Sequence, residues 1–157
     1  MNRKNLYWLG LIILVIFLDQ LTKYLVRCDI PENTGIHITS FFNLVHASNF
    51  GAAFSFLDLP GGAQRLLFSS ISLIISVALI IWLLRTPREQ RWQLAALSLI
   101  IGGALGNFWD RAVNGYVIDF LQFHWGIYYY PAFNIADSAV CVGAAMLVVC
   151  LLRSSKK

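Results

Sequence analysis

Four long apolar stretches constrain the fold of this chain more than any other feature. A helix needs roughly 20 predominantly apolar residues to cross a hydrocarbon layer about 30 Å thick. Of the 157 residues, 58% are hydrophobic and only 13% are charged, and this composition excludes an ordinary soluble domain. Because lipid offers no hydrogen bonds to the backbone, each stretch is predicted to be a helix. The predicted spans are Leu6–Val26, Leu66–Leu84, Leu94–Ala112 and Phe133–Leu152.

The distribution of basic residues predicts how these spans are oriented. Eight of the twelve Lys and Arg residues precede the first span, join the second to the third, or follow the fourth. Four spans place these positions on one side, which the positive-inside rule makes the cytoplasm. Both ends are therefore expected there, with residues 29–65 and 113–131 outside. The net charge of +4 follows from this topology, so no nucleic-acid partner is expected.

The start of the chain could also be interpreted as a cleaved signal peptide. No small-x-small cleavage site follows the apolar run, and Asp19 to Lys23 continue with helical spacing. We therefore expect the first span to be retained.

The two outer segments contain many aromatic and β-branched residues. Residues 36–45 are predicted to be extended, Asn49-Phe50-Gly51 to turn, and residues 52–56 to be extended again before Pro60-Gly61-Gly62. Residues 123–130 form an aromatic belt suited to a membrane interface. The expected fold class is an all-α membrane protein: one domain over residues 1–157, with four transmembrane helices, a small β-sheet and a short second loop region outside.

Aspartates near the outer helix ends are the main candidates for chemistry. Charges at membrane depth cost about 2.5–3.5 kcal/mol each, so such residues usually have a function. Asp119 and Asp137 are the preferred pair. Two carboxylates held close cannot both ionise readily, so one of them keeps a proton. One member could deprotonate a water while the other protonates a carbonyl oxygen. Local capping or pairing of each aspartate is the alternative. The four candidates are Asp19, Asp110, Asp119 and Asp137.

Other polar residues surround these aspartates in the sequence. Asp19 and Lys23 are four apart, as in an intrahelical ion pair, which favours a structural role. Asn49 lies at a turn, where an asparagine usually bonds its own backbone. Small residues at the end of the third span would allow a close helix approach. These are Gly102, Gly103 and Gly106, followed by Asn107, Asp110 and Arg111.

Metal and disulfide chemistry are not expected. His37, His46 and His124 lack the spacing of metal ligands, and no cysteine is near them. The three cysteines are interpreted as packing residues. No cofactor is expected.

Five stretches in order along the chain resemble the lipoprotein signal peptidase family, signal peptidase II. They are Asp19–Lys23, Asn49–Ser55, Gly102–Arg111, Val117–Phe120 and Phe133–Ser138. The resemblance implies an aspartic endopeptidase of the bacterial cytoplasmic membrane that cuts diacylglyceryl-modified prolipoproteins before the lipidated cysteine.

By motif position, the resemblance also implies roles for individual residues. Asp119 and Asp137 match the catalytic dyad, with the site toward the periplasm. Asn49, Asn107, Arg111 and Asn134 match residues that line the site. The Asp19–Lys23 pair and Asp110 match supporting positions. Membrane lipid is an expected partner, and a monomer is expected.

Two other classes of function are weighed against the peptidase. A four-span proton-coupled transporter would use membrane carboxylates, but it predicts a carboxylate near the midplane, repeats and short loops. A non-catalytic scaffold could assemble through Gly102 and Gly103, but it leaves the aspartate pair unexplained.

Overall fold

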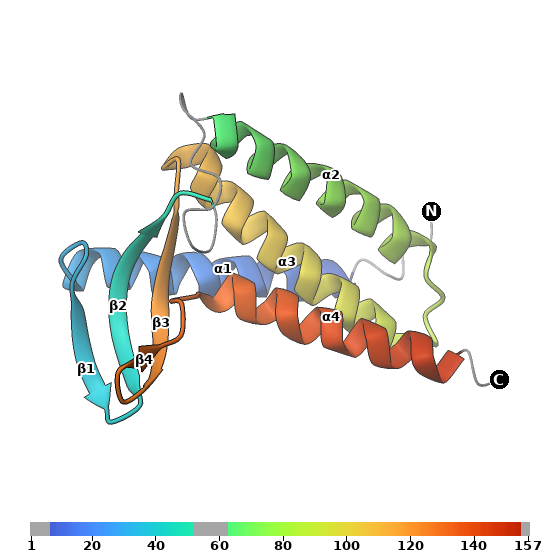
Figure 1. The fold of residues 1–157 in the computed structure, drawn as a ribbon. Helices are drawn as coiled ribbons and strands as arrows, with labels where there is room; N and C mark the ends of the chain where they lie inside the picture. Colours follow the sequence, from blue (N-terminus) through green and yellow to red (C-terminus); the bar gives the residue numbers. More distant parts are fainter. Residues whose placement is uncertain (1–6, 52–62, 155–157) are drawn as a thin grey trace.

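Four long helices form the body of the molecule in a computed structural model that describes residues 7–51 and 63–154 (Figure 1). The helices are α1 (Tyr7–Asp29), α2 (Ala63–Arg85), α3 (Arg91–Val113) and α4 (Ile135–Ser154). All four are long and apolar enough to cross a membrane, which confirms the predicted fold class of four such helices with a small sheet. Their outward faces carry many exposed large apolar side chains, as expected of helices solvated by lipid.

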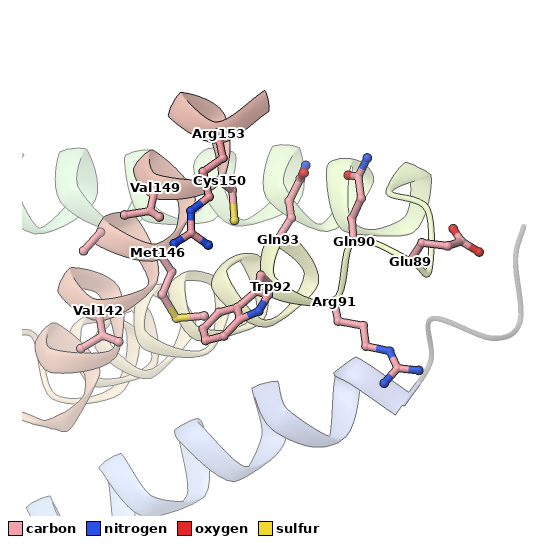
Figure 2. Close-up of a pocket in the computed structure, with 11 residues that line it drawn as sticks. Glu89, Gln90, Arg91, Trp92, Gln93, Val142, Met146, Val149, Cys150 and Arg153 are labelled. Carbon is pink, nitrogen blue, oxygen red and sulfur yellow. The ribbon is translucent and has the colours of Figure 1, made fainter. Parts of the chain in front are cut away.

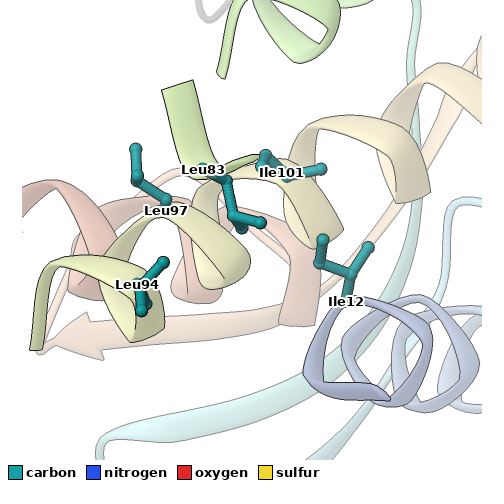
Figure 3. Close-up of a cluster of buried hydrophobic side chains, with 5 residues drawn as sticks. All are labelled: Ile12, Leu83, Leu94, Leu97 and Ile101. Carbon is teal, nitrogen blue, oxygen red and sulfur yellow. The ribbon is translucent and has the colours of Figure 1, made fainter. Parts of the chain in front are cut away.

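α3 is the central helix, because it packs against each of the other three. A buried apolar cluster joins α1, α2 and α3, and Figure 3 shows its five members, Ile12, Leu83, Leu94, Leu97 and Ile101. α3 is also the most buried of the four spans. Polar residues on α3 can therefore meet residues from both α1 and α4.

A four-stranded antiparallel sheet lies beside one end of the bundle (Figure 1). Its strands are β1 (Gly35–Thr39), β2 (Phe42–Asn49), β3 (Val117–Trp125) and β4 (Tyr128–Tyr129), paired in that order. α1 begins and α4 ends at the other end of the bundle. A second buried cluster, with Val26 and Ile30 against Ile118 and Phe120, fixes the sheet to the end of α1.

The small predicted sheet also takes in part of the second outer segment. Residues 117–125 form β3, an inner strand of the sheet, because they pair with β2. This pairing joins segments about 70 residues apart in the sequence, so the pattern of neither segment alone predicts it. Of the predicted features of the first outer segment, residues 52–56 and 60–62 lie outside the described residues.

Candidate active site

Asp119 is held on β3 by the register of the sheet. Asp119 pairs with Ala47 on β2, and this register places Asn49 diagonally across from Asp119. The Asn49 Nδ2 donates to Asp119 Oδ2 at 2.8 Å, while Asn49 Oδ1 accepts from the backbone N–H of Gly51 at 3.0 Å. Asn49 therefore bonds its own backbone, as its place at a turn predicts, and also reaches the carboxylate.

Asp137 belongs to the N-terminal cap of α4. Its backbone N–H donates to Asn134 Oδ1 at 2.9 Å, and the Asn134 N–H donates back to Asp137 Oδ2 at 3.2 Å. This reciprocal pair is a capping box, which satisfies two N–H groups that the helix leaves unpaired. The carboxylate is therefore fixed by the start of the helix, as predicted from its place in the first turn.

The start of α4 is also tied to β3. The Phe133 carbonyl accepts from the N–H of Leu121 at 2.8 Å, and the Phe133 N–H donates to the Leu121 carbonyl at 3.0 Å. This short bridge sets the cap of α4 directly beside Asp119.

Two asparagine side chains link the carboxylates of Asp119 and Asp137. Asn134 Nδ2 donates to Asp119 Oδ1 at 2.7 Å and contacts Asn107 Oδ1 at 3.2 Å. Asn107 Nδ2 donates to Asp137 Oδ1 at 2.7 Å. The two acids therefore share one hydrogen-bonded network, built from β2, α3, β3 and the α4 cap.

The two carboxyl groups differ in their surroundings. Asp119 is only 3% exposed, whereas Asp137 is half-buried. Burial raises the pKa of Asp119 to about 6, and the nearby Asp137 charge adds to this rise, against the hydrogen bonds from Asn49 and Asn134. The pair therefore has one dry carboxyl that favours a proton and one that reaches the surface.

Behind this network lies a buried cluster of charges around Lys23. Its Nζ lies 2.7 Å from Asp19 Oδ2, 2.7 Å from Asp110 Oδ2 and 3.0 Å from Asn107 Oδ1. Because the ammonium can only donate, it fixes the oxygen of the Asn107 amide toward itself and the nitrogen toward Asp137. Asp19 and Lys23 thus form the predicted intrahelical pair, and that pair also supports the candidate site.

Asp19 reaches α4 directly as well. Its Oδ1 accepts from the backbone N–H of Ala136 at 2.9 Å, in the first turn of that helix. A carboxylate is stabilised there by the unpaired N–H groups and the helix dipole.

The predicted glycines allow these close approaches. A Cβ at Gly103 would overlap the Ala136 carbonyl of α4, and one at Gly102 would lie 2.8 Å from the Val15 side chain of α1. At Gly106 it would lie 2.7 Å from Asp19 Oδ2. The three glycines therefore let α3 meet α1 and α4 at the level of the acids.

Arg111 lies at the edge of the network. It is half-buried, its Nη1 lies 3.5 Å from the Asn107 carbonyl, and its guanidinium is 5.8 Å from the centre of the Phe68 ring. The charges of Asp137 and Asp119 act on it from nearby. This cation is placed to attract a carbonyl or anionic group that approaches the acids.

Gln20 is a member of the network that the sequence interpretation missed. Its Nε2 lies 3.0 Å from Asp110 Oδ1 and 3.2 Å from Asp19 Oδ2. Its position next to Asp19 in the span was the available signal, since a glutamine amide in lipid needs polar partners. In residues 7–51 and 63–154, no three His, Cys, Asp or Glu side chains come together as potential metal ligands.

Comparison with known proteins identifies the family. The model of the family described as signal peptidase (SPase) II matches residues 11–153. This chain belongs to the signal peptidase II family. Its members are proteases, so the chain is a membrane-embedded hydrolase of a bacterial family, which favours the peptidase over the transporter and the scaffold.

Relatives and solved structures match nearly the whole chain. A lipoprotein signal peptidase of Aeromonas hydrophila is 50% identical, covering 99% of this chain and 94% of the relative. One from Vibrio cholerae is 43% identical, covering 99% and 92%. Two solved bacterial membrane enzymes share the fold. The first has a TM-score of 0.84 and 30% identity over 95% of this chain and 89% of the solved chain. For the second the values are 0.82 and 31%, over 93% and 92%.

Proposed function

We propose that this signal peptidase II family member is an aspartic endopeptidase that removes signal peptides from prolipoproteins. The substrate class is supported by relatives that carry the name lipoprotein signal peptidase. In its finer form, the proposal is cleavage just before a cysteine already modified with diacylglycerol. The observation that carries it is the joining of Asp119 and Asp137 through the Asn134 and Asn107 side chains.

Different roles follow for the two acids from their burial. Asp137, the more exposed, takes a proton from water, and the water oxygen bonds to the carbonyl carbon of the scissile peptide. Asp119, buried and with a raised pKa, gives its proton to the carbonyl oxygen. The tetrahedral intermediate, which carries two hydroxyls, then breaks its C–N bond. Asp137 gives its proton to the departing nitrogen, and one hydroxyl returns a proton to Asp119 as the carboxylic acid product forms.

The surrounding residues position these groups. Asn49 and Asn134 hold Asp119 from two sides, and Asn107 holds Asp137. Arg111 faces the approaching peptide carbonyl. The Lys23 cluster and the glycines of α3 support this arrangement without touching substrate.

The membrane placement fits a lipidated substrate. A signal peptide is an apolar helix and the acyl chains stay in lipid, so the scissile bond lies at the interface. With both termini in the cytoplasm, the sheet and the acids face the periplasm. We propose that one copy of the chain acts alone in the cytoplasmic membrane.

The test is cleavage of a lipidated prolipoprotein by purified protein in detergent. Asp119→Asn and Asp137→Asn, made singly, should each lower kcat at least about a hundredfold, because each removes a proton-transfer group. Asp29→Asn is the matched control, since Asp29 is an exposed carboxylate at the end of α1.

Near-normal turnover by either dyad variant, with folding intact by thermal unfolding, would refute the assignment. Activity should also survive a strong chelator. Loss that zinc restores would move the site into the metallopeptidases.

A further inference from the structure

A cavity lies at the end of the bundle far from the sheet. Its volume is about 830 Å³, and it is bounded by the start of α3 and the last three turns of α4. Apolar side chains, Trp92 on α3 and Val142, Met146 and Val149 on α4, form much of its lining (Figure 2). It is separate from the acid network, and the proposed peptidase chemistry does not use it.

Basic side chains border this apolar space. Figure 2 shows the Arg153 side chain directed from α4 toward Met146, with Arg91 on the opposite rim extending toward α1. Among the described residues, neither arginine is paired with a carboxylate. Glu89 also reaches the rim, but its carboxylate points away from Arg153 in Figure 2. Within residues 7–51 and 63–154, the mouth of the cavity therefore carries positive charge that no ion pair neutralises.

The depth of the cavity matches one lipid leaflet. Arg153 and Val142 are eleven residues apart on α4, or about 16 Å along the helix. Half of a hydrocarbon layer about 30 Å thick is about 15 Å. Arg153 therefore lies at headgroup level when Val142 lies near the bilayer centre.

We propose that this cavity binds an anionic glycerophospholipid of the surrounding bilayer. The lipid phosphate pairs with Arg153, and one acyl chain lies along Val149, Met146 and Val142 against Trp92. A guanidinium binds phosphate through charge-assisted hydrogen bonds, and basic pockets between transmembrane helices suit acidic headgroups. A zwitterionic lipid binds less well, because its own cation is repelled by the two arginines.

Protein occupants fit the site less well. A partner helix that filled the cavity would bury Arg153 away from water without a counter-charge. A two-fold dimer through this face would bring two basic rims together. A lipid phosphate supplies the missing negative charge.

The test compares lipid binding by native mass spectrometry on the full chain in detergent. Phosphatidylglycerol and phosphatidylcholine with identical acyl chains are titrated in parallel. Wild-type protein should bind phosphatidylglycerol about tenfold more tightly, and Arg153→Gln should lose most of that preference. Arg85→Gln, at the exposed end of α2 and outside the cavity, should keep it.

A second pair of variants tests the acyl-chain site. Ala145 lines the cavity, whereas its neighbour Ala144 is exposed and does not. Ala145→Trp should fill the space and abolish tight phosphatidylglycerol binding, and Ala144→Trp should not. Thermal unfolding and monodispersity check that each variant is folded, independently of peptidase activity.

Three results would overturn the proposal. The first is equal binding of the two lipids by wild-type protein. The second is equal behaviour of Arg153→Gln and Arg85→Gln, or of the two tryptophan variants. The third is a wild-type dimer that Ala145→Trp dissociates, which would make the cavity an interface between copies.

Discussion

The buried ammonium group of Lys23 contacts three polar side chains, those of Asp19, Asp110 and Asn107. It is 2% exposed and lies between the equally buried carboxylates of Asp19 and Asp110. Removing one partner of a buried ion pair leaves an uncompensated charge, which costs far more than the pair itself contributes. The same ammonium orients the Asn107 amide toward Asp137. Stability and site geometry therefore depend on a single side chain.

Lys23→Met should lower the free energy of unfolding by about 3–5 kcal/mol, because two carboxylates would remain buried beside each other. Arg27→Met is the control on the same helix, since Arg27 is exposed, and it should cost less than about 1 kcal/mol. Denaturation in detergent measures both. Equal losses would mean that the cluster is not buried.

Asp119 should make stability depend on pH. Its pKa is raised from 3.8 to about 6, so between these values the folded chain binds more protons at this position than the unfolded chain. The free energy of unfolding should therefore fall as pH rises from about 4 to 6, by at most about 3 kcal/mol. Denaturation at pH 4.5 and 7 should show a flatter dependence in Asp119→Asn and the wild-type dependence in Asp29→Asn. Identical slopes in all three proteins would contradict a raised pKa.

At the scale of elements, α3 brings the acids together by packing closely on two neighbours. Gly103 lets the first turn of α4 approach, and Gly106 leaves room for Asp19 of α1. The capping box of Asn134 and Asp137 then fixes the start of α4 at that contact. Helix packing therefore determines the positions of the polar groups.

Gly103→Ala should separate α3 from α4, since its Cβ would overlap the Ala136 carbonyl. We expect a loss of about 1–3 kcal/mol and a fall in cleavage, because Asn107 would shift relative to Asp137. Gly10→Ala is the control, since no described atom beyond its neighbouring residues and its own helix backbone lies within 4 Å of the new Cβ. Thermal unfolding and the cleavage assay should both separate the two variants, and similar behaviour would rule out a tight α3–α4 contact.

Local patterns predicted the helices and singled out the candidate aspartates, but not how the parts join. Apolar length alone gives the four spans, and the place of Asp137 in the first turn of α4 follows from the sequence. β3 was missed because α2 and α3 separate it from its partner β2 in the sequence, so no local pattern reveals the pairing. Asp19 and Lys23 looked like an isolated pair, since their link to Asp110 exists only once α1 packs against α3.

At the scale of the whole molecule, the acidic network and a group of arginines lie at opposite ends of the helix bundle. The acid network lies next to the sheet, while Arg85, Arg91 and Arg153 lie at the opposite end of the bundle. The proposed topology holds the basic end in the cytoplasm, and it therefore predicts that the acids face the periplasm.

Labelling with a membrane-impermeant thiol reagent tests this orientation in a cysteine-free background. Ile127, beside β4, is 84% exposed, so a cysteine introduced by Ile127→Cys should react in intact cells. Glu89→Cys, between α2 and α3, should react only after the membrane is permeabilised. The reverse pattern would invert the proposed topology.

The proposed dyad draws on segments spread from α1 to α4, and its last part, the Asn134–Asp137 cap, begins the final helix. During synthesis, β2 cannot pair with β3 until β3 has been made, and Asp119 lacks its hydrogen bond from Asn134 until that later residue has been added. On the proposed dyad assignment, a growing chain that still lacks α4 has no complete catalytic pair. We therefore expect peptidase activity only after α4 has been inserted into the membrane.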